Sequence, residues 1–128
     1  MASGFPTTVG TVFSADMFNQ LVNFTVTTES GATYTVDNDD LYQVMIQTSN
    51  ASTKTVTIAP DSTLTAALVG SAITVINTGA GLLSFAAGSG VTLTSAGAVS
   101  AAPTLATHKV AQCVRVSANT WRIYGGIA

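Results

Sequence analysis

Short runs in which threonine alternates with an apolar residue, each ended by a cluster of glycine, asparagine, aspartate or serine, constrain this chain most. The 128 residues include 21 threonines and 14 valines, and both side chains are branched at Cβ, which favours extended backbone. A period of two places one face of a strand on a core and the other toward solvent. Turn clusters at intervals of roughly 8 to 12 residues are typical of a sandwich or a barrel. The pattern therefore predicts an all-β fold.

The alternation divides the chain into roughly eight or nine short strands. We expect them at Phe24–Val26, Tyr34–Val36, Leu41–Thr48, Thr53–Ile58, Ala72–Ile76, Leu82–Ala86, Val91–Ser95, Lys109–Val116 and Thr120–Tyr124. Leu41–Thr48 is apolar on both faces, as a central strand covered on both sides would be. The segment Ala96–Ala106 is rich in alanine and serine, contains Pro103 and is expected to be a long loop. We expect an antiparallel β-sandwich or barrel-like domain.

The N-terminal part differs from the rest. Residues 1–13 are small and threonine-rich, contain Pro6, and are expected to form an arm. Ser14 can cap a helix, and Asp16 follows near its positive end. Four apolar residues then share one helical face, namely Met17, Phe18, Leu21 and Val22. The sequence thus predicts one short N-terminal helix and a single β-domain over residues 14–128.

The C-terminal strands are expected to form a hairpin through the Ser117–Thr120 turn. Alternation places Trp121 and Ile123 toward the core, opposite Val114 and Val116, with Arg122 and Tyr124 on the other face. The core residues expected from the whole pattern are Val44, Ile46, Val56, Ile58, Val114, Val116, Trp121 and Ile123.

Composition excludes several classes of function. The chain is 47% hydrophobic and 8% charged, with a formal net charge of −2, so it lacks the basic stripe of a nucleic-acid binder or of a polybasic membrane anchor. It is long enough to bury a core without disulfides or a structural metal. No stretch reaches the ~18 apolar residues of a spanning helix. Met1–Thr11 lacks the features of a secretion signal, so we expect folding without passage through a membrane.

Candidate catalytic residues are few. His108 is the single histidine, and no nucleophile and orienting partner stand near it in sequence, so a structural or surface role is favoured. Cys113 lies within an expected strand; Arg115 could make its surroundings electropositive, but a buried, inert thiol is the favoured interpretation. A single cysteine excludes a disulfide framework and a cysteine-rich zinc site. We therefore expect no enzyme activity and no cofactor.

Two further motifs have a functional and a structural interpretation. Asp37–Asp40 offers several oxygen ligands for calcium, but it lacks the glycine and the distal glutamate of an EF-hand loop, and aspartate and asparagine also dominate ordinary turns. Gly79–Gly81 and Gly88–Gly90 could cradle phosphate, but neither leads into a helical pattern and tight β-turns explain both. We predict no metal site, while cation binding at Asp37–Asp40 stays open.

The surface raises a different question. Four basic and six acidic residues cannot cover a domain of this size in the usual mixed-charge way. Threonine, serine, alanine and glycine must form much of the exterior of a protein with many strand edges, and such edges aggregate unless they are paired or covered. These features favour a permanent assembly in which subunit contacts bury part of the surface.

Several segments resemble a β-module of tailed-bacteriophage virion proteins. They are Thr33–Asp37 with Asp40, Ser52–Pro60, Val75–Gly81, Phe85–Ser95, His108–Ala111, Arg115–Val116 and Asn119–Gly125. The resemblance extends from about Thr33 to Gly126. It implies a non-enzymatic protein of the virion surface, made in the host cytoplasm, in a group where homotrimers are common and the module occurs in capsid-attached proteins, tail-associated proteins and tail fibres.

The chain shows no repeats or heptads of the kind that build a long fibre shaft. A short module with an N-terminal arm therefore favours a trimeric capsid decoration, or cement, protein that binds the major capsid protein or other virion proteins. The apolar residues expected to contact the capsid are Phe5, Val9, Val12, Phe13 and Phe18. The alternatives are a short tail, collar or fibre-tip protein, with or without a receptor-binding role, and a small carbohydrate-binding module.

Overall fold

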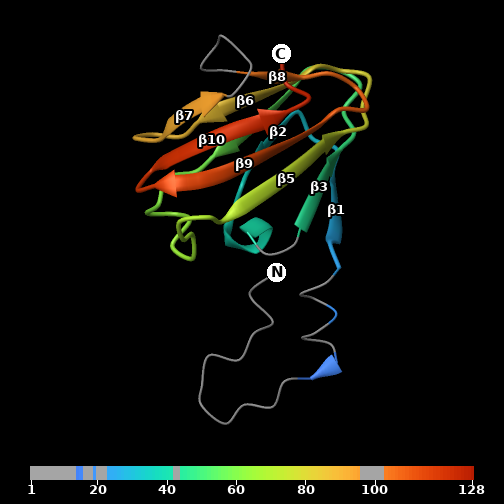
Figure 1. The fold of residues 1–128 in the computed structure, drawn as a ribbon. Helices are drawn as coiled ribbons and strands as arrows, with labels where there is room; N and C mark the ends of the chain where they lie inside the picture. The colour runs from blue at the N-terminus through green and yellow to red at the C-terminus, as the bar shows by residue number, and fades with distance from the viewer. Residues whose placement is uncertain (1–13, 16–18, 20–22, 42–43, 96–102) are drawn as a thin grey trace.

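The computed structural model describes residues 14, 15, 19, 23–41, 44–95 and 103–128. This part of the chain is mostly β and forms two sheets (Figure 1). Its elements are β1 (Thr25–Glu29), β2 (Thr33–Thr35), the 3-10 helix η1 (Asn38–Leu41), β3 (Val44–Thr48), β4 (Lys54–Ile58), β5 (Ala72–Asn77), β6 (Leu83–Ala87), β7 (Thr92–Ser95), β8 (Thr104–Leu105), β9 (Val110–Ser117) and β10 (Thr120–Gly125). The expected β-rich, two-sheet fold is confirmed.

The expected antiparallel arrangement is wrong, because both sheets are mixed. The six-stranded sheet has the order β1-β3-β5-β9-β10-β7, and the four-stranded sheet has the order β2-β4-β6-β8. Pairing is parallel between β1, β3 and β5, between β2, β4 and β6, and between β7 and β10. Pairing is antiparallel in β5–β9–β10 and β6–β8.

The reason lies in the turns. From β1 to β6, consecutive strands alternate between the two sheets. Short turns such as Ser30–Ala32 therefore join the two sheets as arches, although in sequence they are indistinguishable from hairpin turns. Because the chain returns to the same sheet only every second strand, neighbours within a sheet run in the same direction. We call each such pair of consecutive strands a coil; the first coil is β1–β2, the second β3–β4 and the third β5–β6.

The three coils are related by an internal repeat. In the six-stranded sheet, Glu29 pairs with Thr48 and Thr48 with Asn77; in the other sheet, Tyr34 pairs with Val56 and Val56 with Phe85. The residues that follow Glu29, Thr48 and Asn77 then align as three similar arch sequences, namely Ser30-Gly31-Ala32, Ser49-Asn50-Ala51 and Thr78-Gly79-Ala80. The repeat is hard to see in the sequence because the spacing between coils is unequal and the shared arch is short.

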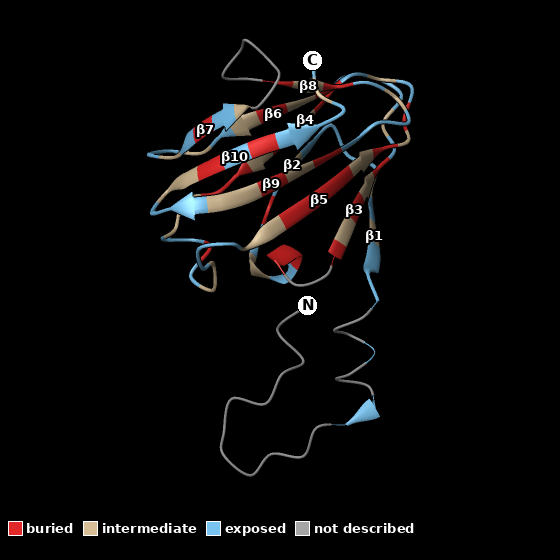
Figure 2. Ribbon diagram, in the orientation of Figure 1, coloured by how far each residue is buried: buried red, intermediate tan, exposed pale blue. Residues whose placement is uncertain are grey.

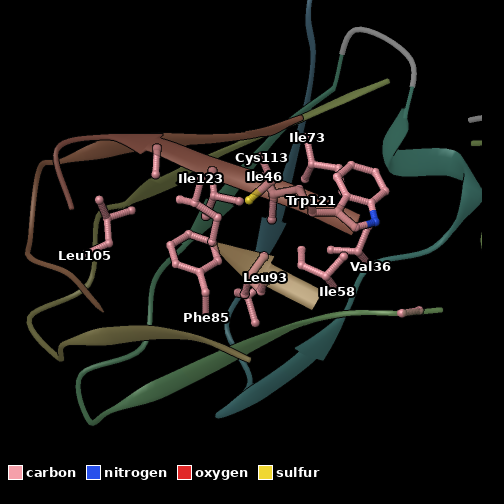
Figure 3. Packing of buried hydrophobic residues seen from close by; sticks show 14 of the residues in the cluster. Val36, Ile46, Ile58, Ile73, Phe85, Leu93, Leu105, Cys113, Trp121 and Ile123 are labelled. Atoms are coloured by element: carbon pink, nitrogen blue, oxygen red, sulfur yellow. The ribbon is translucent and has the colours of Figure 1, made fainter. Parts of the chain in front are cut away.

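The core lies between the two sheets (Figure 3). Strands β3 and β4 alternate between buried and half-buried residues, so each presents one face to this core. Six residues expected in the core are buried, namely Val44, Ile46, Val56, Ile58, Trp121 and Ile123. Phe85, Ile73 and Leu105 join them. Burying one large apolar side chain of this kind stabilises a fold by about 1.5–3 kcal/mol, so the inner coils and the hairpin hold the domain together.

Two valines expected in the core are not there. Val114 is half-buried and Val116 is 42% exposed, while Ala111 and Cys113 form the core face of β9. The hairpin begins as expected, with Ser117 opposite Thr120, but its register shifts between Thr120 and Trp121. Trp121 therefore pairs with Arg115 and Ile123 with Cys113. A bulge of one residue shifts the pairing of the following strand by one position, so each core-facing residue of β10 lies opposite the other face of β9 from the one expected. This explains why Val114 and Val116 are not in the core.

Other boundaries also differ. The Leu41–Thr48 segment is not one strand, because Leu41 ends η1 and β3 begins at Val44. The expected loop Ala96–Ala106 contains the short strand β8. The arm over residues 1–13 lies outside the described residues, as does most of the expected Ser14–Val22 helix. Both stay predictions.

Candidate interaction surface

The two residues considered for catalysis have structural positions. His108 is exposed, adopts a left-handed φ of 65° and donates its backbone N–H to the Asn77 carbonyl oxygen at 2.6 Å. Cys113 is fully buried in the core, and burial raises the pKa of its thiol to about 12. A thiol with so high a pKa stays protonated at neutral pH and is a weak nucleophile.

The Asp37–Asp40 segment is a turn whose side chains bond to their own surroundings. The Asp40 carboxylate is buried and accepts hydrogen bonds from the Tyr34 hydroxyl at 2.7 Å and from the Asp37 backbone N–H at 3.0 Å. Asp37 accepts the Asp39 backbone N–H at 2.9 Å. Burial raises the pKa values of both Asp40 and Tyr34, and their hydrogen bond adds to the shift at Tyr34. Asp37 and Asp40, two of the residues considered as possible calcium ligands, thus shape the turn.

The described residues contain no group of three or more histidine, cysteine, aspartate or glutamate side chains arranged to hold a metal ion. Among the same residues there is no helix with the length and apolar character needed to span a membrane.

The two glycine motifs serve the backbone in different ways. Gly90 has a φ of 78°, and Val91 N–H donates to the Gly88 carbonyl at 3.0 Å, so Gly88–Gly90 is the tight turn that was expected. At Gly79, by contrast, a Cβ atom would lie 2.2 Å from the Asn50 carbonyl oxygen. This glycine is needed because the arch of the second coil lies directly against that of the third.

A buried lysine closes the first arch, and the sequence analysis did not single it out. Lys54 is buried, and its ammonium group donates to the carbonyl oxygens of Glu29, at 3.1 Å, and of Gly31. Burial lowers its pKa, while the charge of Glu29 acts in the opposite direction. Asn50 adds a side-chain hydrogen bond to the Ser30 carbonyl at 2.8 Å. The first coil is therefore fixed to the second through its arch.

The ion pair of Asp61 and Arg115 ties the loop after β4 to the C-terminal hairpin. Arg115 donates to the two carboxylate oxygens at 3.2 and 2.7 Å, and the Asn119 backbone N–H donates at 2.9 Å. Arg115 thus has a structural partner and does not serve Cys113. These donors lower the pKa of Asp61, chiefly through the Arg115 hydrogen bond.

Large apolar side chains are exposed at several positions of the described residues, including Leu82, Val110 and Tyr124, and the most exposed ones form two pairs. Phe24 and Val26, at the start of β1, are 50% and 57% exposed. Leu68 and Val69, in the loop before β5, are 72% and 71% exposed, and Gly70 N–H donates to the Arg115 carbonyl beside exposed Val116. The residues expected to contact a capsid, Phe5, Val9, Val12, Phe13 and Phe18, lie outside the described residues.

Both strands of the first coil, β1 and β2, lack buried residues. None of the five residues of β1 is buried, whereas β3 beside it buries three of five (Figure 2). Val26 pairs with Met45, which lies on the outer face of β3, so Thr25, Thr27 and Glu29 face inward. Alternation alone could not show this, because it does not say which of the two faces meets the core.

Comparisons with known proteins found no family model that matches the chain, no similar curated protein and no similar solved structure.

Proposed function

We propose that the chain is a non-enzymatic structural protein of a tailed-phage virion, and that it acts as a homotrimeric capsid decoration protein on the outer surface of the particle. The observation that carries the proposal is the surface. Phe24, Val26, Leu68 and Val69 are exposed on a protein with four basic and six acidic residues, and exposed apolar patches on charge-poor domains mark protein interfaces.

Two of the charged side chains, Asp40 and Lys54, are buried, and two more, Asp61 and Arg115, pair with each other. The exterior is therefore even poorer in charge than the composition suggests. Exposed threonines on β1, β2 and β7 form part of it. Such a surface suits extended contacts with neighbouring subunits more than it suits an isolated monomer.

A decoration protein stabilises a shell by bridging neighbouring capsid subunits, so that separating them also breaks its own contacts. Binding to the assembled lattice alone shifts the equilibrium toward that lattice by mass action. We propose that Phe5, Val9, Val12, Phe13 and Phe18 supply part of this contact. Deleting Met1–Thr11 would then leave the trimer intact and lower capsid occupancy.

The second candidate is a short tail, collar or fibre-tip protein. Parallel coils that stack in register favour it, because such coils also build elongated structures. A carbohydrate-binding role gains less support, because Trp121 is fully buried and cannot stack on a sugar.

Two measurements test the proposal. Sedimentation at micromolar concentration is expected to show a trimer, and a well-behaved monomer would contradict it. Purified phage particles should then carry the protein at many copies on heads. A few copies on tails would favour the second candidate, and absence from both heads and tails would overturn a virion role.

A further inference from the structure

The outer side of the first coil carries a glycine, Gly31, and the described residues place nothing on it. Counted from the ladder of the six-stranded sheet, Gly31 of the first arch corresponds to Gly79 of the third, although the first arch is three residues shorter. The Cβ position of Gly79 is blocked by the Asn50 backbone of the second arch, whereas a Cβ on Gly31 would come no closer than 3.6 Å to the Thr33 carbonyl oxygen. Gly31 also lacks a left-handed φ. Neither backbone conformation nor packing within the described residues requires a glycine there, but the approach of another backbone would.

The strand edges at this end support the same conclusion. β1 ends the six-stranded sheet and β2 ends the four-stranded sheet, on the same side of the stack (Figure 1). An edge strand offers backbone N–H and C=O groups that accept a further strand. Exposed Phe24 and Val26 add apolar contacts beside that edge. Lys54 and Asn50 hold the arch in place, so little order would have to be gained on binding.

Charge identifies the kind of strand. The segment from Phe24 to Leu41 contains no lysine or arginine; Asp37 and Asp39 are exposed and Glu29 is half-buried, whereas Asp40 is buried. Glu29 lies at the arch end of β1, and Asp37 and Asp39 follow β2 at the opposite end of the strands. Lys54 offsets part of this charge from behind, within the domain. A partner segment with basic residues at its two ends is therefore favoured.

We propose that the outer side of the first coil binds an extended, basic segment of another virion protein, which adds to β1 as a further strand and passes close to Gly31. The inference deepens the proposed function, because it names a surface through which the protein would hold its partner. Its test below uses no capsid. A negative result would remove this binding mode and leave decoration open, and a positive result would stand even if the particle location proved different.

The test uses the full chain and a synthetic peptide, Lys-Thr-Val-Thr-Val-Thr-Lys, with a control peptide in which glutamate replaces both lysines. Amide hydrogen exchange and chemical shifts of the protein are measured by NMR at peptide concentrations up to about 1 mM, since single-strand addition is weak. The lysine peptide is expected to slow exchange in Thr25–Glu29 and to shift the Gly31 resonance. The glutamate peptide is expected to do neither.

Two variants and one matched control locate the site. Gly31→Leu fills the space above the arch, and Val26→Lys places a like charge and a long side chain at the edge; each is expected to weaken lysine-peptide binding at least about tenfold. Val69→Lys makes the same change at an apolar residue of similar exposure in a different place and is expected to alter binding less than about twofold. Thermal unfolding establishes that each variant is folded. If Gly31→Leu does not fold, Val26→Lys still tests the proposal.

Three results would overturn the proposal. The first is no peptide effect on Thr25–Glu29, or an equal effect from the glutamate peptide. The second is slow exchange in β1 without peptide that depends on protein concentration, which would show a second copy on the edge. The third is slow exchange at every concentration, which would show that the chain covers this edge itself.

Discussion

The two ends of the strand stack are finished differently. At the far end of the four-stranded sheet, the C-terminus pairs with β8: Leu105 bridges to Ile127, and Thr104 and Ala128 exchange backbone hydrogen bonds of 3.2 and 3.0 Å. At the near end, β1 and β2 each pair on one side only, and no described residue pairs with their outer edges. The coils at this end have similar arch sequences. Strands β3 and β4 of the second coil nevertheless bury three residues each, whereas β1 of the first coil buries none.

The difference shows how one repeat can serve two purposes. Inner coils gain stability from neighbours on both sides, since each coil buries its apolar face only when stacked. The first coil contributes polar inward residues, Thr25, Thr27 and Glu29, and depends on the arch contacts of Lys54 and Asn50. We therefore expect changes in the inner coils and the hairpin to affect folding, and changes on the outer side of the first coil to affect association.

The largest effect on folding is expected from Trp121→Ala. Trp121 is fully buried between the sheets and lies among Ile58, Ile73 and Val36 (Figure 3). Removing so large a side chain from a core costs about 3–5 kcal/mol of unfolding free energy. Urea unfolding monitored by circular dichroism measures it. An unchanged midpoint would mean that the hairpin does not close the core.

Sequence reasoning located the strands and Trp121 because both depend on local alternation. It did not identify the sheet to which each strand belongs, since an arch and a hairpin use the same turn residues and only long-range pairing separates them. It placed Val114 and Val116 inside because the bulge at Thr120 is a matter of register, which sequence does not display. It overlooked Gly31 and Lys54, whose meaning depends on the coil stacked beside them. The signal that could have revealed the repeat is the similarity of the three arch sequences, Ser-Gly-Ala, Ser-Asn-Ala and Thr-Gly-Ala.

The next effect in size is expected from Gly79→Ala. A Cβ atom there would lie 2.2 Å from the Asn50 carbonyl oxygen and 2.8 Å from its carbon, both backbone atoms that cannot rotate away. The second and third arches would have to separate, at a cost of about 1–3 kcal/mol, as for other overpacked sites. Thermal unfolding measures the change. A variant as stable as the parent chain would show that these arches are not in tight contact.

Asp61→Asn is expected to cause a smaller loss, and one that depends on pH. The pKa of Asp61 is lowered from 3.8 by its Arg115 hydrogen bond, so the folded state favours the charged carboxylate. That contribution is fully present above the unfolded pKa and disappears as pH falls through the lower folded pKa. Melting temperatures of the parent and the variant should therefore differ most above pH 3.8 and converge as the pH falls below it. A gap that is constant with pH would exclude the ion pair as its cause.

The smallest effect on folding, and the sharpest comparison, is expected from Gly31→Ala. The position is equivalent to Gly79, but a Cβ atom there meets nothing closer than 3.6 Å and the backbone φ is one that alanine adopts. Stability should change by less than about 0.5 kcal/mol or rise slightly, because alanine restricts the unfolded chain. Melting Gly31→Ala beside Gly79→Ala under the same conditions gives the contrast directly. Equal destabilisation by the two variants would mean that another backbone already covers the first arch in the isolated protein, and the outer side of the first coil would then not be open to a partner.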